Sequence, residues 1–217
     1  MNFNMTDNAI VRALSKLCDF MILNILWVIC SIPLFTIGAA TTAMYSVMLK
    51  IVKNEEGYIV KGFFGAFKAN FKKSTILWLI IAAIGIVIGL DFRMVSMFSG
   101  TMRTVFQAVF SMITMVVIFV AVYAFPMTAR YENTVKQTVK NALLLSVARL
   151  PYTLILLVIH VVPVILTLLT GQTLIIGILL WLVVGVSLVA WLSSMVLRKV
   201  FEILDPKDDE DSSKEPK

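Results

Sequence analysis

Long apolar stretches separated by short basic segments decide what this chain can fold into. Of its 217 residues, 59% are hydrophobic and only 15% are charged, and the mean hydropathy is +0.93. A soluble domain carries about 25% charged residues and cannot hide this much apolar surface from water. A bilayer can, provided that every backbone polar group is satisfied within helices. The composition therefore predicts an all-α, polytopic transmembrane helical bundle.

The first apolar stretch, from Cys18 to Ile32, is followed by Pro33 and Gly38 and then by a second stretch from 39 to 53. Proline ends or kinks a helix. One interpretation is a hairpin of two membrane helices, and another is a single long kinked helix. The returning helix of the hairpin would be short, since a crossing takes about 20 residues. A third interpretation, a cleaved signal peptide, lacks a clean A-x-A site.

The hairpin gives six crossings in one membrane domain, 1–204, and the kinked helix gives five. We expect six spans, at residues 8–32, 39–53, 74–90, 105–125, 152–170 and 174–197. We expect Pro126 to close the fourth span. Residues 205–217, DPKDDEDSSKEPK, contain no large apolar side chain, and we expect them to form a disordered cytoplasmic tail.

Two basic segments between the spans show helical spacing of apolar residues. In the first, Phe64, Phe67 and Phe71 recur beside lysines, and in the second, Tyr131, Val135 and Val139 recur in the same way. The pattern predicts two short amphipathic helices on the cytoplasmic membrane surface. Their cations form the candidate partner surface, namely Lys61, Lys68, Lys72, Lys73, Arg130, Lys136 and Lys140. Simple interfacial anchoring is the alternative.

Almost all the arginines and lysines before residue 205 fall on one side of the predicted membrane. Arg93 and Arg103 are the exceptions. The positive-inside rule makes the basic side cytoplasmic. We expect a cytoplasmic C-terminus with either five or six crossings and, with six, a cytoplasmic N-terminus. The basic residues flank apolar spans, so we expect contact with anionic lipid and no binding of nucleic acid.

Few groups inside the spans could carry chemistry. Pro33, Gly38, His160 and Pro163 are candidate helix-break or substrate positions, because discontinuous helices often build the substrate sites of transporters. His160 is the only histidine. A neutral ring bonded to a neighbouring helix is the alternative to a proton relay. Asp19, one turn after Lys16, suggests a local ion pair or helix cap.

Two further patterns indicate packing. Gly85 and Gly89 form a G-x-x-x-G pair, which we interpret as internal helix packing in preference to a dimer interface. Cys18 and Cys30 are about 18 Å apart along one helix, too far for a disulfide, which needs α-carbons within about 7 Å. Both should be small apolar fillers.

Catalytic and metal-binding motifs are absent from the sequence. It holds no H-E-x-x-H, G-x-S-x-G, Walker loop or Cys-His cluster, and its acidic residues are not placed for paired-carboxylate catalysis. We therefore expect no enzyme activity, no cofactor and no metal.

Three segments carry a family resemblance: LNILWVICSIPLFTIGAATTAMY, KNEEGYIVKGFFGAFKANFKK and PMTARYENTVKQTVKNALLLSVARLPYTL. Through them the chain resembles the YesL family of bacterial integral membrane proteins over about Leu17 to Leu204. The family has no assigned activity. Its members are often encoded beside carbohydrate importers and sugar-degrading enzymes, so the resemblance implies a context of carbohydrate uptake or utilisation in the bacterial plasma membrane.

These observations lead to two hypotheses. The first is an accessory component that binds a partner, such as carbohydrate importer subunits or another membrane protein. The second is a small transporter that works as an oligomer.

Overall fold

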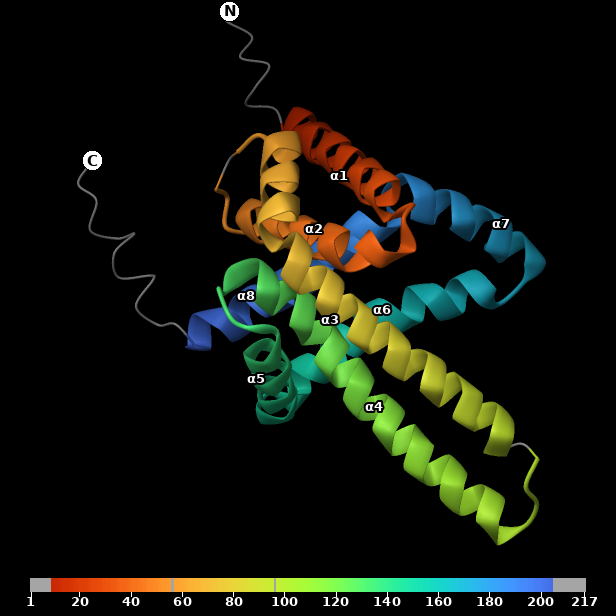
Figure 1. Ribbon diagram of the computed structural model, residues 1–217. Helices are drawn as coiled ribbons and strands as arrows, with labels where there is room; N and C mark the ends of the chain where they lie inside the picture. Colours follow the sequence, from red (N-terminus) through yellow and green to blue (C-terminus); the bar gives the residue numbers. More distant parts are fainter. Residues whose placement is uncertain (1–8, 56, 96, 205–217) are drawn as a thin grey trace, which may run out of the picture.

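The computed structural model describes residues 9–55, 57–95 and 97–204. All its regular elements are helices (Figure 1). They are α1 (Ala9–Ser31), the 3₁₀ turn η2 (Leu34–Thr36), α2 (Ile37–Val52), α3 (Ile59–Val95), α4 (Thr101–Arg130), α5 (Val135–Ala148), α6 (Leu150–Leu168), α7 (Gly171–Leu180), the π-helical segment η3 (Trp181–Gly185) and α8 (Val186–Leu204). The predicted tail, 205–217, lies outside the described residues.

Six helices in this described part are long and apolar enough to cross a membrane. The sequence-based prediction of an all-α bundle with six membrane helices is thus confirmed. The alternative single kinked helix at the start does not form. Instead α1 ends at Ser31, the chain turns through Pro33 and η2, and α2 runs back along the bundle (Figure 1).

The short helix α2 is the centre of the bundle. It contacts α1, α3, α4 and α8, and 61% of its span is buried, against 22% or less for the other five spans. Its buried positions include four small residues, Gly38, Ala39, Ala40 and Ala43, which let neighbouring backbones approach closely. Its 16 residues are about 24 Å long, and protein rather than lipid covers most of that length.

Hydrogen bonds from three different helices reach polar side chains on α2. The Trp27 indole of α1 donates to Thr41 Oγ1 at 3.1 Å. Ser74 Oγ of α3 donates to Thr42 Oγ1 at 2.8 Å, and Tyr45 meets α6, as described below. Polar groups removed from water need such partners, so these residues fix which helices surround α2.

Two pairs of helices form long hairpins that point away from the start of α1 and the end of α8 (Figure 1). One consists of α3 and α4, and the other of α6 and α7. Their turns define what we call the far end of the molecule. The opposite end, called the basic end, holds the α2–α3 and α4–α5 connections, α5 and the end of α8 (Figure 1).

The first predicted surface helix is not a separate element. Residues 59–73 are the beginning of α3, a single helix of 37 residues, about 55 Å long and so longer than the ~30 Å hydrocarbon core. Gly62 and Gly65 did not interrupt it. Phe63 is fully buried against the bundle, so tertiary packing stabilises this part of the helix. The second predicted surface helix exists as α5.

Two expectations about helix ends and packing are wrong. Pro126 does not close its span, since α4 continues to Arg130, and Pro126 lies in a buried segment where neighbouring helices support the backbone. The glycine pair Gly85 and Gly89 does not pack inside this chain. A Cβ added at either position would meet no atom within 4 Å, so this face of α3 points outward.

Candidate functional site

His160 of α6 and Tyr45 of α2 form a hydrogen-bonded pair inside the bundle. His160 Nδ1 lies 2.8 Å from the Leu156 carbonyl oxygen, which can only accept, so Nδ1 carries the proton. Nε2 lies 3.3 Å from the Tyr45 hydroxyl, and in the neutral ring it would accept from that hydroxyl. The bond to a neighbouring helix, which the alternative interpretation expected of His160, is therefore present.

Two neighbouring serines of α8 are buried, and one of them lies beside Tyr45. Ser193 and Ser194 are fully buried, and Ser193 is next to the Tyr45 phenol. Neither serine hydroxyl has a hydrogen-bond partner of good geometry. Tyr45, which the sequence analysis did not single out, thus joins α2, α6 and α8. Its place in a mostly apolar run was the signal, because a buried phenol usually needs a partner.

The other candidate substrate positions have structural roles. Pro33 lies exposed in the turn after α1, where the Thr36 hydroxyl donates to its carbonyl at 2.6 Å. Gly38 marks a close approach, since a Cβ there would lie 2.4 Å from the Ser74 carbonyl oxygen. Pro163 does not break α6, and its carbonyl accepts from Thr167 Oγ1 at 2.7 Å. Gly38 packs on α3 and α4, whereas His160 contacts Tyr45, so the four candidates do not form one site.

Asn24 of α1 forms hydrogen bonds to the last span. Its side chain is fully buried, and Nδ2 donates to the carbonyls of Trp181 and Leu182, at 3.0 and 2.7 Å. Its Oδ1 accepts from the Ser187 N–H at 3.0 Å. The Asn24 side-chain amide therefore forms hydrogen bonds to backbone groups in and next to the π-helical segment. Such segments occur frequently at functional sites.

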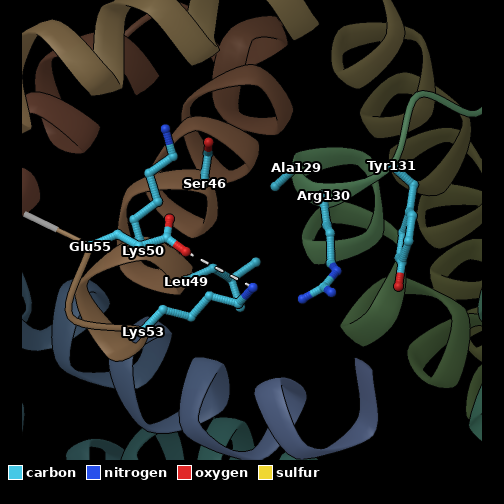
Figure 2. Close-up of a pocket in the computed structure, with 8 residues that line it drawn as sticks. All are labelled: Ser46, Leu49, Lys50, Lys53, Glu55, Ala129, Arg130 and Tyr131. Atoms are coloured by element: carbon cyan, nitrogen blue, oxygen red, sulfur yellow. Dashed lines mark ion pairs between the residues drawn. The ribbon is translucent and has the colours of Figure 1, made fainter. Parts of the chain in front are cut away.

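A pocket of about 330 Å³ opens at the basic end, between the ends of α2 and α4. Figure 2 shows the side chains that line it, namely Ser46, Leu49, Lys50, Lys53, Glu55, Ala129, Arg130 and Tyr131. Lys53 Nζ is 4.0 Å from Glu55 Oε1. We call these residues the basic pocket. The sequence could not reveal it, because its cations come from segments about 80 residues apart.

The predicted partner cations divide into two groups. Arg130 is half-buried and lines the basic pocket, with its guanidinium 5.3 Å from the centre of the Phe201 ring. Lys73 is also half-buried. The exposed group, which we call the exposed lysines, consists of Lys61, Lys68 and Lys72 on α3 and Lys136 and Lys140 on α5. The start of α3 and α5 lie apart, with the ends of α2 and α4 between them in this view (Figure 1).

Asp19, Cys18 and Cys30 are the remaining residues that the sequence analysis singled out. Asp19 is half-buried, and the structure records no ion pair between it and Lys16 in the part of α1 that it describes, so the expected pair is not seen. Cys18 and Cys30 are both free thiols, as their separation predicted. Among the described residues, His, Cys, Asp and Glu side chains form no group of three or more that could hold a metal ion.

Comparison with known proteins finds relatives of unassigned activity. Residues 20–92 match the family model described as "Protein of unknown function, DUF624". The chain is 29% identical over 165 residues to the uncharacterized protein YteU of Bacillus subtilis (strain 168), covering 71% of this chain and 72% of that protein. It is 24% identical over 157 residues to the uncharacterized protein YesL of the same organism, covering 69% and 74%. No solved structure matches. The resemblance to the YesL family of bacterial membrane proteins, expected from the sequence, is thereby confirmed.

Proposed function

We propose that this chain is a non-catalytic accessory protein of the bacterial plasma membrane that binds a partner protein at its cytoplasmic face. The observation that carries the proposal is the placement of the exposed lysines. They lie on two helices, α3 and α5, at the basic end. The positive-inside rule makes this end cytoplasmic, where cationic groups on rigid elements attract and orient an acidic partner surface.

The polar groups inside the bundle support the same proposal. Asn24, Thr41, Thr42, Tyr45 and His160 all make hydrogen bonds between helices. In His160 both ring nitrogens are engaged. A substrate would have to displace these bonds, which favours a structural role for the membrane part and a functional role for the basic end. From the neighbourhood that the family resemblance implies, we infer a carbohydrate importer or a membrane sensor as the partner.

The test is crosslinking and affinity purification from native membranes, followed by mass spectrometry. The wild-type chain should recover importer subunits or another membrane protein. A variant with Lys61→Glu, Lys68→Glu and Lys72→Glu, or one with Lys136→Glu and Lys140→Glu, should lose that partner. Arg103→Glu at the far end is the control and should keep it. Recovery of the same partner at wild-type yield by both lysine variants would contradict the proposal.

A small oligomeric transporter is the second candidate, favoured by one observation. The π-helical segment Trp181–Gly185 interrupts the last span, and irregular segments within spans often build transport sites. Purified protein in liposomes should then move a solute, and His160→Ala or Pro33→Ala should reduce the flux while partner binding persists. Absence of flux for a panel of sugars, combined with loss of partner in the lysine variants, decides for the accessory protein.

A further inference from the structure

We propose that the turn between α1 and α2 lies inside the membrane, where lipid acyl chains cover it, and that it does not reach the water beyond the far end. The α1–α2 hairpin is then re-entrant, because it enters and leaves the membrane at the basic end. We call residues 32–36 the α1–α2 turn. The inference goes beyond the proposed partner binding and does not depend on it.

Contacts with α3 fix the position of the α1–α2 turn in the bundle. The Trp78 indole of α3 donates to the Leu34 carbonyl oxygen at 2.8 Å, and a Cβ added at Gly38 would lie 2.5 Å from Trp78 Cβ. The turn is therefore level with Trp78. From there α3 continues to Val95, about 25 Å further along the helix. Both long hairpins extend past the turn in Figure 1.

The charged residues of α3 indicate where the hydrocarbon core begins and ends. Lys73 precedes a long apolar run, and Asp91 follows it. The helix from Lys73 to Asp91 is about 27 Å long, close to the ~30 Å of a hydrocarbon core. Trp78 is about 8 Å from Lys73 and about 20 Å from Asp91 along the helix. The α1–α2 turn beside Trp78 therefore lies within the membrane, nearer to the basic end than to the far end.

The exposed side chains of the α1–α2 turn are apolar. Ile32 is 73% exposed, Leu34 is 75% exposed and Phe35 is 51% exposed. No charged residue occurs in the sequence from 20 to 49. Large apolar side chains that are exposed together mark a surface that contacts a partner or a membrane, and the depth of this turn identifies acyl chains as what contacts it.

The two turns at the far end expose polar side chains. Ser99 lies exposed in the α3–α4 turn, next to apolar Met97 and Phe98. Thr170 and Gln172 are exposed in the α6–α7 turn. Both turns therefore offer groups that water can solvate, whereas the exposed side chains of the α1–α2 turn offer none.

Three carbonyl groups at the α1–α2 turn have donors within the protein. Lipid offers no hydrogen bonds, so irregular backbone at membrane depth needs protein partners. The Thr36 hydroxyl lies within hydrogen-bonding distance of the Cys30 and Pro33 carbonyl oxygens, and the Thr36 N–H donates to Pro33 at 2.8 Å. Trp78 provides the donor for Leu34. These bonds let the turn lie in hydrocarbon at a lower cost.

A re-entrant hairpin also accounts for the length of α2. A helix of 16 residues, about 24 Å long, is shorter than the ~30 Å hydrocarbon core. It need not cross that core if the chain turns inside it. The start of α1 and the end of α2 both stay at the basic end, as they would in a hairpin that crosses completely. The sidedness of the other helices is therefore unchanged.

The first experiment measures whether water reaches the turn. It uses the full chain with Cys18→Ala and Cys30→Ala and one new cysteine, Leu34→Cys, or Ser99→Cys as the matched control. A membrane-impermeant maleimide is applied to intact cells and to inverted membrane vesicles. Leu34→Cys should react at least about tenfold more slowly than Ser99→Cys from either side, because an apolar environment suppresses the reactive thiolate. In urea and detergent both cysteines should react alike.

The second experiment tests contact with lipid directly. The same variants carry a bimane label and are reconstituted in phosphatidylcholine liposomes. Lipid with brominated acyl chains should quench the label at Leu34→Cys, and iodide in the water should not. The label at Ser99→Cys should show the opposite pattern. Ile86→Cys is the control for lipid contact, because Ile86 is 65% exposed within the apolar run of α3.

Three results would overturn the proposal. Labelling of Leu34→Cys at the rate of Ser99→Cys, from the side that labels Ser99→Cys, would show that the hairpin crosses the whole membrane. Quenching by iodide would likewise show that water reaches the turn. Quenching by neither agent would show that protein, such as a second copy of this chain, covers it. If Leu34→Cys does not fold, Ile32→Cys gives the same readings at the neighbouring exposed position.

Discussion

At the scale of single residues, Asn24 is the polar side chain that connects the first span to the last. Its amide makes three hydrogen bonds to backbone groups of Trp181, Leu182 and Ser187. The carbonyl of Leu182 and the N–H of Ser187 are five residues apart, the spacing of a π-helix. Asn24 thus forms hydrogen bonds to backbone groups that are spaced as in a π-helix. We infer that these bonds stabilise the π-helical segment.

Replacing Asn24 by leucine should therefore destabilise the protein. Interhelical hydrogen bonds in membranes contribute about 0.6 kcal/mol each, so three of them give about 2 kcal/mol. The measurement is reversible unfolding in mixed detergent, followed by circular dichroism. Ser111→Ala is the control, because the Ser111 hydroxyl donates only within its own helix, to Gln107. Equal stability of Asn24→Leu and Ser111→Ala would show that the amide has no such role.

At the scale of helices, Gly38 determines how closely α2 and α3 approach. A Cβ at this position would lie 2.4 Å from the Ser74 carbonyl oxygen and 2.5 Å from Trp78 Cβ. Backbone atoms cannot rotate out of the way, so the helices would have to separate. The Thr42–Ser74 hydrogen bond of 2.8 Å lies in the same contact and would lengthen with them.

Gly38→Ala is expected to lower the free energy of unfolding by about 1–3 kcal/mol, as overpacking in a core does. Gly85→Ala is the matched control on α3, where an added Cβ meets nothing within 4 Å. Alanine there should stabilise the helix by up to about 1 kcal/mol, through helix propensity alone. Unfolding in detergent measures both. Loss of stability in Gly85→Ala would instead indicate that its face of α3 packs against another molecule.

Most of the helices, but not their exact extent, could be predicted from the sequence. Hydropathy located all six spans, because lipid exposure imposes long apolar runs. It could not show that residues 59–73 continue into α3, since burial of Phe63 is a tertiary effect. It could not predict the π-helical segment either. Trp181–Gly185 is apolar throughout, so the hydropathy pattern does not distinguish it from the α-helix on either side.

The candidate sites were predicted less well than the spans. From the sequence we identified His160 as a candidate residue and considered a hydrogen bond to a neighbouring helix as the alternative to a proton relay. It did not identify Tyr45, since the crossing of α2 and α6 is not encoded in local periodicity. Arg130 was assigned to the partner surface by its position in a basic segment, yet it lines the basic pocket. Which cations share a pocket depends on helix packing and not on spacing along the chain.

At the scale of the whole molecule, the division between a basic end and a far end gives a topology that can be measured. Arg93 and Arg103 lie beside the α3–α4 turn at the far end. The exposed lysines lie at the basic end, with the start of α1 and the end of α8. From the positive-inside rule we predict that the far end faces outward and that the start of α1 and the end of α8 face the cytoplasm.

Single-cysteine labelling tests this orientation. In a background with Cys18→Ala and Cys30→Ala, a membrane-impermeant maleimide should label Ser99→Cys in intact cells. Glu132→Cys should react only after the membrane is permeabilised, because it lies in the α4–α5 connection. The reverse pattern would place the exposed lysines and the basic pocket outside the cell, and would remove the basis for a cytoplasmic partner.

The central position of α2 has a consequence for synthesis in the cell. Its neighbours α3, α4 and α8 follow it in the chain, and α8 is the last helix. At 5–20 residues per second, the ~150 residues from the end of α2 to the end of α8 take roughly 10–30 s to make. During that interval the threonines and tyrosine of α2 face lipid, the insertion machinery or a chaperone. Newly made chains that end before α8 should therefore be a preferred substrate for membrane quality-control proteases.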